Sequence, residues 1–388
     1  MSRPSSISQP LLALAFVLFF PSTAVVQRYL GMPGVALYLA AASVLLWLGQ
    51  RFVFPWVTAR IPPRWAAGLL VASFLALAAL FLALYPIANS GVVGGGSDGD
   101  DALDVAASAL LQGQYPYYPR TYLGNPISPL PGSVLLATPF VAALGGSADQ
   151  NLLWLALFFV TMGVALRSAG QALLLLWVML LLSPALLHAL AIGSDYIANG
   201  LFVLLFAWWL LAWASRPSGS ILVTVLLAAL LGVALASRAQ FILLLPLIFS
   251  ALGRRVGWRP AAGLLAVSIG TLAAVTLPFL LYDPAGFTPL GTYREIGIFD
   301  AVLPGAGVGI ALATALAGLA LAWQDNGQMA VFLRNCTAVL ALPVVCGVVL
   351  MSIGLGRIDF SFAAFGVMFL FFGAAAFWSA SRRPDQSR

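Results

Sequence analysis

The sequence predicts an all-α, polytopic membrane protein with about twelve transmembrane helices. Of its 388 residues, 62% are hydrophobic and only 8% are charged, and the mean hydropathy is +1.02. The apolar residues form repeated runs of 18 or more, long enough to cross a bilayer as helices. Their hydrophobicity is continuous rather than alternating, which excludes the strands of a barrel. We therefore treat 1–388 as a single transmembrane domain.

Twelve apolar segments are the predicted spans, in chain order. They are 11–29, 33–50, 65–88, 150–167, 171–190, 197–214, 219–237, 239–252, 261–281, 304–323, 330–354 and 360–380. The apolar piece 133–144 is expected to lie in or beside the membrane interface, kinked by Pro129, Pro131 and Pro139. The first 24 residues also fit a signal peptide, and we prefer an uncleaved first span.

The arginines predict which side of the membrane each loop faces. If the N-terminus is cytoplasmic, 13 of the 18 basic residues, all of them arginine, lie inside, as short cytoplasmic loops require. The five external arginines are Arg28, Arg120, Arg238, Arg294 and Arg357. Ten of the twelve acids then face outward. The net charge of +6 is thus a topology signal, and it gives no support to a nucleic-acid partner.

Two long polar loops, 89–149 and 282–303, are both predicted to be external. The composition, rich in Ala, Gly, Arg and Leu, is typical of a GC-rich bacterial genome and says little about chemistry. We expect the protein in the bacterial cytoplasmic (inner) membrane. Both termini would be cytoplasmic and the chemistry periplasmic. The second loop contains Asp283, Tyr293, Arg294, Glu295 and Asp300. It carries no motif that we assign.

The first loop contains a third of all the acidic residues, four of twelve, within seven positions. These are Asp98, Asp100, Asp101 and Asp104. From Asp100 the apolar spacing predicts an amphipathic helix along the membrane surface, ended by Gly113. One aspartate at a helix start is commonly a cap, but four neighbouring like charges repel one another. We therefore favour function for the cluster while leaving capping as the alternative.

Tyrosines follow the acids among rigid turns. Tyr115, Tyr117 and Tyr122 offer aromatic faces that suit a sugar or interfacial lipid. The alternative is an ordinary aromatic belt at the membrane interface. Taken alone, the belt is the simpler interpretation.

The order of these parts resembles the first periplasmic loop of GT-C membrane glycosyltransferases. It is carried by Gly99-Asp100-Asp101-Ala102, the stretch 106–113, Tyr115-Pro116-Tyr117 and the proline-rich apolar helix that ends at Gly145. The likeness is to the branch that uses polyprenyl-phosphate sugars, mannosyltransferases included. It implies that an early acid, Asp100 or Asp101, is the catalytic base. The usual Asp-Glu pair before a tyrosine is replaced here by Asp100-Asp101 before Asp104, so the choice between the two stays open.

Two further positions fit the resemblance, and both are predicted to be external. Asp195, just before the span at 197, fits the family's second acid, with capping of that span as the equal alternative. The resemblance implies that Arg238 meets the phosphate of the lipid donor, a contact that a guanidinium makes well. The alternative is an arginine that extends to the interface. His188 is interpreted as a polar interfacial residue, and Cys336 and Cys346 as packing residues of one span.

Together with these residues, the resemblance implies an inverting glycosyltransferase. It would pass a sugar from a polyprenyl-phosphate donor to a lipid-linked or cell-envelope glycan acceptor, with Asp100 or Asp101 as general base. Asp98 and Asp195 would hold acceptor hydroxyls. No cofactor is required, although Asp98 and Asp100 have a spacing that suits a divalent cation such as Mg²⁺ or Mn²⁺. The alternatives are a transporter or flippase of lipid-linked saccharides and a noncatalytic scaffold.

Overall fold

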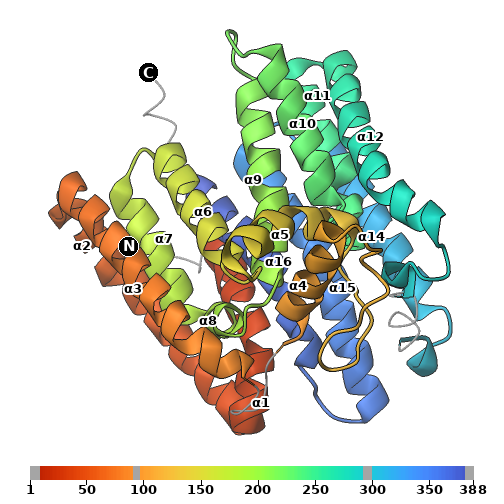
Figure 1. Cartoon of the computed structure of the whole chain (residues 1–388). Helices are drawn as coiled ribbons and strands as arrows, with labels where there is room; N and C mark the ends of the chain where they lie inside the picture. Colours follow the sequence, from red (N-terminus) through yellow and green to blue (C-terminus); the bar gives the residue numbers. More distant parts are fainter. Residues whose placement is uncertain (1–8, 91–96, 292–298, 381–388) are drawn as a thin grey trace.

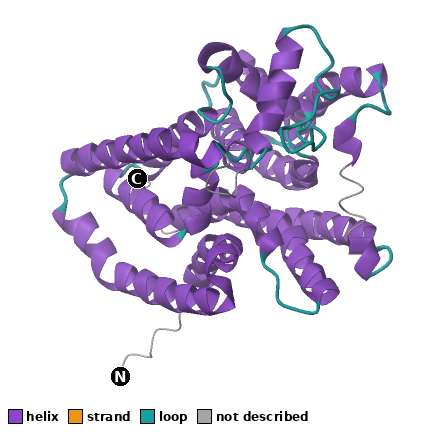
Figure 2. Ribbon diagram, turned by 60° about the horizontal axis from the view of Figure 1, so that its bottom comes forward, coloured by secondary structure: helices purple, strands orange, loops and turns teal. Residues whose placement is uncertain are grey.

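The computed structural model describes residues 9–90, 97–291 and 299–380, and this part of the chain folds as a helical bundle (Figures 1 and 2). Its first half contains α1 (Gln9–Leu48), η1 (Gly49–Val53), α2 (Phe54–Arg60), α3 (Pro63–Asn89), α4 (Gly99–Leu111), α5 (Pro131–Leu144), α6 (Gln150–Leu166), α7 (Ala169–Leu182) and α8 (Pro184–Ala191). Its second half contains α9 (Tyr196–Ala214), α10 (Ile221–Leu235), η2 (Ala239–Leu244), α11 (Leu245–Val256), α12 (Trp258–Tyr282), η3 (Thr288–Gly291), α14 (Ala306–Trp323), α15 (Met329–Leu355), η4 (Ser361–Gly366) and α16 (Val367–Ala380).

Eight helices in the described residues are long and apolar enough to cross a membrane, or nine if one bent pair is a single span. The chain is therefore a polytopic helical membrane protein. Every predicted span coincides with helix, but the count of twelve is not confirmed. Two predicted spans, 150–167 and 219–237, are the shorter helices α6 and α10. The first two predicted spans, 11–29 and 33–50, form one continuous stretch with α2.

That first stretch runs for 51 residues, from Pro10 to Arg60. A straight helix of this length would be about 75 Å long, far more than a bilayer core of about 30 Å. The helix is interrupted at Gly31, whose φ of 65° and ψ of −170° are not helical. The break separates two helical segments, as the two predicted spans require.

The predicted span 171–190 was wrong as a straight helix. It consists of α7 and α8, which meet at an angle of 83°. Pro184 is the first residue of α8 and cannot continue a helix from before it. The Ser183 hydroxyl accepts a hydrogen bond from the Leu186 amide and caps the new helix. The bend turns α8 against α1 and α3.

The core of the bundle is α9 and α16, whose side chains are buried almost throughout. The surface helices α3 and α12 are mostly exposed, as lipid-facing helices of a membrane protein are. The short helix α5 crosses α9 and α10 rather than running along them (Figure 1). The sequence predicted an apolar helix at 133–144, and α5 occupies these residues. Together with α4, α5 covers one side of the bundle and forms a small apolar core of its own around Leu103 and Val134.

Candidate functional site

Helix α4 begins and ends near the predicted positions, with Asp98 before its first residue and Gly113, at φ 71°, after its end. The Asp98 side chain makes no capping hydrogen bond. Its carboxylate instead accepts hydrogen bonds from Thr121 Oγ1 and Asn125 Nδ2, both at 2.8 Å. Asp101 accepts one from the Tyr122 backbone amide at 2.7 Å. These two acids hold the loop that follows α4, so the capping alternative does not describe them.

Asp100 has a different environment, because it is only 1% exposed. Tyr85, on α3, donates a hydrogen bond of 2.7 Å to its Oδ2. Its Oδ1 is also buried and has no hydrogen-bond partner among the described residues. Burial raises the pKa of the Asp100 carboxyl to about 6, although the Tyr85 hydrogen bond works in the opposite direction. A carboxyl with this pKa is ionised at neutral pH yet still accepts a proton readily, as a general base must.

Asp195 is the second buried acid, 2% exposed, directly before α9. Its side chain does not cap α9. It forms an ion pair with Arg238 and accepts a hydrogen bond of 2.7 Å from Asn199 Nδ2. Asn199 in turn accepts one of 2.9 Å from the Ser133 hydroxyl. This polar network joins α5, α9 and the turn between α10 and η2.

Two glycines bring Asp100 and Asp195 into one site. A Cβ at Gly99 would lie 3.1 Å from Asp195 Oδ1, and a Cβ at Gly193 would lie 2.8 Å from Asp100 Oδ2. Gly193 also has a φ of 66°, which disfavours any other residue. Asp195 therefore lies against the first residue of α4, while Asp100 lies against the turn that leads to Asp195. The sequence predicted that these acids share a site, and the structure brings them together.

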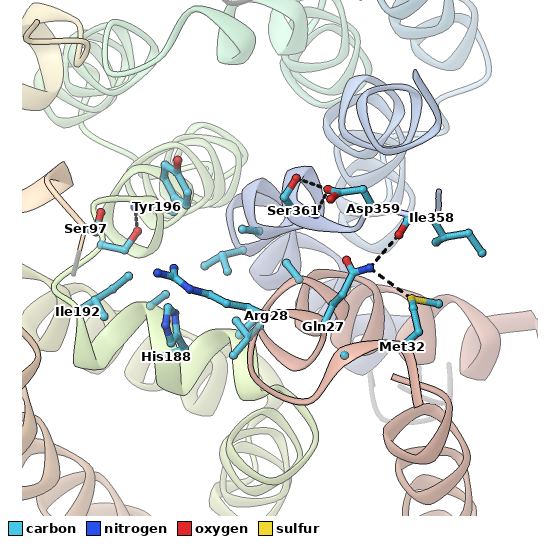
Figure 3. A pocket seen from close by; sticks show the side chains of 18 of the residues that line it. Gln27, Arg28, Met32, Ser97, His188, Ile192, Tyr196, Ile358, Asp359 and Ser361 are labelled. Atoms are coloured by element: carbon cyan, nitrogen blue, oxygen red, sulfur yellow. Dashed lines mark hydrogen bonds between the residues drawn. The ribbon is translucent and has the colours of Figure 1, made fainter. Parts of the chain in front are cut away.

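A cavity of about 980 Å³ adjoins this acidic pair (Figure 3). It lies between the break in α1, helix α8, the start of α9 and the segment around η4. Its lining includes residues that the sequence analysis did not assign to a site, namely Gln27, Arg28, Arg357 and Asp359, together with His188. Tyr196 connects the two regions, because its side chain lines the cavity and its ring centroid lies 5.7 Å from Arg238 Cζ. The available signal was that Arg28 and Arg357 are two of the five arginines predicted to be external.

Two of the three predicted tyrosines lie elsewhere, in an aromatic cluster beside the end of α12. Tyr115 donates a hydrogen bond of 2.8 Å to the Phe279 carbonyl. Tyr117, 2% exposed, packs edge-on against Phe287 with ring centroids 4.9 Å apart. Tyr122 is 54% exposed beside Asp101. None of the three lines the cavity, and burial accounts for Tyr115 and Tyr117 as packing residues.

Asp98 and Asp100 are the two residues predicted to suit a divalent cation. In the structure, the Asp98 carboxylate accepts a hydrogen bond from the loop after α4, whereas the Asp100 carboxylate accepts one from Tyr85. Within the described residues, no group of three or more His, Cys, Asp or Glu side chains could hold a metal ion. In the second predicted loop, Asp300 accepts a hydrogen bond from the Gly307 amide at the start of α14. Tyr293, Arg294 and Glu295 lie outside the described residues.

The site thus combines a buried carboxyl of raised pKa, a buried ion pair and a cavity with cationic residues in its lining. Such a set can accept a proton, bind hydroxyl groups and bind an anion. Comparisons of the chain with protein-family models, curated proteins and solved structures find no match.

Proposed function

We propose that the protein is a membrane glycosyltransferase that passes a sugar from a polyprenyl-phosphate donor to a lipid-linked or cell-envelope glycan acceptor. The observation that carries the proposal is the buried Asp100, with its raised pKa, held beside the Asp195–Arg238 ion pair. A structural carboxylate gains stability from full pairing, whereas Asp100 is buried with only one oxygen hydrogen-bonded among the described residues. This arrangement is better suited to proton transfer than to stability.

In the proposed reaction, Asp100 takes the proton from an acceptor hydroxyl while that oxygen attacks the anomeric carbon of the donor sugar. The bond from the anomeric carbon to the phosphate oxygen breaks on the opposite face, so the anomeric configuration inverts. The lipid phosphate leaves with the electron pair as an anion and needs no proton, because it is already a stable leaving group. Asp101 is the alternative base, and its hydrogen bond to the Tyr122 amide makes it the second choice.

Arg238 would stabilise the negative charge on the departing phosphate. A guanidinium has five N–H donors, so it can contact Asp195 and a phosphate at once. Asp98 and Asp195 would hold acceptor hydroxyls, and the exposed Tyr122 would stack on a sugar ring. A divalent cation is not required, and transfer that persists in EDTA would support this.

The test is sugar transfer by the purified full-length chain in lipid vesicles, with a panel of polyprenyl-phosphate sugars and acceptors extracted from bacterial membranes. We expect transfer by the wild type and a loss of at least about 100-fold in Asp100→Asn, the size of a typical general-base contribution. The matched control is Asp149→Asn, which removes a less buried carboxylate before α6. Equal loss in the control would contradict the assignment of Asp100.

The flippase alternative makes the opposite prediction in the same vesicles. Wild-type protein would then move lipid-linked saccharide across the bilayer without transferring sugar from any donor. A noncatalytic scaffold would do neither, and neutralising the acids would leave its assembly unchanged. Sugar transfer that Asp100→Asn abolishes excludes both.

A further inference from the structure

The cavity beside Tyr196 has two kinds of wall. Gln27, Ser97 and Ser194 contribute polar groups, while Met32, Ile192 and Val367 contribute apolar ones. Its volume of about 980 Å³ is at the upper end of the range for pockets that hold small ligands. A ligand that fits both walls has a polar head and an apolar chain.

The cavity is held open by contacts between segments that are distant in the chain. Gln27 donates a hydrogen bond of 2.8 Å to the Ile358 carbonyl and accepts one of 2.6 Å from the Phe360 amide. This pair fastens α1 to the turn before η4. On the opposite wall, Tyr29 Oη and His188 Nε2 lie 3.3 Å apart and connect α1 to α8. These contacts hold the walls of the cavity in position, and a site held in position costs less to bind.

The charge of the lining is positive. Arg28 and Arg357 both line the cavity, and the guanidinium of Arg28 extends between His188 and Ser97 (Figure 3). The single acid of the lining is Asp359, whose Oδ1 accepts hydrogen bonds from the backbone amide and hydroxyl of Ser361. The ion pair between Arg238 and Asp195 is the only one among the described residues. Arg28 and Arg357 therefore have no described carboxylate to neutralise them, whereas Arg238 has one.

We propose that this cavity binds the phosphate group of a lipid, at a site separate from Arg238. Arg28 and Arg357 would contact the phosphate oxygens, because guanidinium groups bind phosphate in bidentate geometry. Met32, Ile192 and Val367 would contact the first carbons of the chain. The apolar wall and the membrane-spanning helices around it favour a lipid over a free phosphate ester.

A further conclusion, about the chemical class of the acceptor, rests on the proposed function. If the donor phosphate contacts Arg238, a second phosphate site on the same side belongs to the acceptor. The acceptor would then be a phosphate-bearing lipid rather than a neutral glycan. The binding site itself does not depend on sugar transfer.

The test uses the full-length protein in phosphatidylcholine nanodiscs and a fluorescent phosphatidic acid as the probe. We expect Arg28→Gln and Arg357→Gln each to weaken binding by about 10-fold, the effect of losing one charge-assisted contact of about 1.5 kcal/mol. Arg28→Lys, which keeps the charge but loses the bidentate geometry, should weaken binding less than Arg28→Gln does. The control is Arg120→Gln, because Arg120 is an exposed arginine that donates to the Gly124 carbonyl and does not line the cavity.

Three outcomes would overturn the proposal. The first is that the double variant Arg28→Gln/Arg357→Gln binds phosphatidic acid as tightly as the wild type. The second is that Arg120→Gln weakens binding as much as Arg28→Gln does. The third outcome is displacement of the probe by inorganic phosphate below about 1 mM, which would make this a site for free phosphate. Unchanged thermal unfolding of the Arg28→Gln and Arg357→Gln variants separates loss of binding from loss of fold. Arginine-dependent binding without sugar transfer supports this site and counts only against the proposed function.

Discussion

Asp100 and Asp101 are adjacent in the chain but differ in every property that matters for catalysis. Asp100 is buried against Tyr85, and its pKa is raised to about 6. Asp101 is half-buried and holds the Tyr122 amide. The sequence placed both at the start of a helix, but it could not rank them. The residue that separates them, Tyr85, comes from α3 and reaches Asp100 only in the folded chain.

If Asp100 is the base of the proposed sugar transfer, its raised pKa makes the rate of transfer depend on pH. A general base works only when deprotonated, so the rate should fall tenfold per pH unit below about 6. Above that pH it should reach a plateau. Transfer rates between pH 4.5 and 8 at saturating substrate check this. A profile that is flat across pH 6 would rule out Asp100 as the base.

Replacing only one partner of the Asp195–Arg238 ion pair should lower the free energy of unfolding more than replacing both partners. Arg238→Gln leaves a buried charge on Asp195, which costs about 3 kcal/mol in free energy of unfolding. The variant Asp195→Asn/Arg238→Gln leaves no such charge and should be less destabilised than Arg238→Gln alone. Chemical unfolding of the four proteins in one detergent gives the double-mutant cycle. Additive losses would mean that the pair is not coupled.

At the scale of elements, the position of α5 depends on a close contact with the end of α10. The Gly132 amide donates a hydrogen bond of 2.9 Å to the Ala236 carbonyl. A Cβ on Gly132 would lie 2.1 Å from the Val233 carbonyl oxygen, closer than a non-bonded carbon can approach it. This contact positions Ser133 beside Asn199, and through Asn199 it supports Asp195.

Gly132→Ala should therefore separate α5 from α10 and disturb the site. We expect a loss of at least about 2 kcal/mol in the free energy of unfolding, the cost of overpacking, together with reduced sugar transfer. The matched control is Gly263→Ala in α12, where no atom lies within 4 Å of the added Cβ. It should be neutral or stabilising by up to about 1 kcal/mol, because alanine favours helix. Similar losses in both variants would contradict this account of α5.

The sequence predicted where helices lie better than it predicted where they are broken. Hydrophobicity located α3, α9 and α12 because a bilayer span needs one long apolar run. The 83° bend at Ser183 was missed because α7 and α8 together form one continuous apolar run, although Ser183-Pro184 carried the signal. The cavity was also missed. It depends on the direction in which α1 leaves Gly31, which hydrophobicity does not encode.

At the scale of the whole molecule, the predicted orientation separates two sets of loops. Figure 1 shows the α9–α10 and α11–α12 connections at one end of the bundle and the turn between α15 and η4 at the other. The first set carries Arg216, Arg254 and Arg255, and the second carries Arg357. The positive-inside rule predicts that the first end is cytoplasmic and the second end external. The site of Asp100 and the cavity would then be external.

Labelling of introduced cysteines tests this orientation. Gln112 after α4 and Ser218 before α10 are both exposed, so both accept cysteine without disturbing the core. In intact bacterial cells, a membrane-impermeant maleimide should label Gln112→Cys and leave Ser218→Cys unlabelled until the cells are opened. The native Cys336 is buried and Cys346 is partly buried within α15, which limits background labelling. The reverse labelling pattern would show that the orientation is opposite to the predicted one and that the site lies on the cytoplasmic side of the membrane.

The fastening of α1 to the turn before η4 also bears on the order of events during synthesis. Gln27 and its partner Ile358 are 331 positions apart in the chain. A ribosome delivers α1 to the membrane before α15, and the other wall of the cavity emerges only after α15. Until then, Arg357 has not been synthesised, so Arg28 has no second arginine beside it. The growing chain would therefore acquire its helices one after another, but the proposed phosphate site would form in a single late step. A nascent chain could not bind lipid at this site before its helices were assembled.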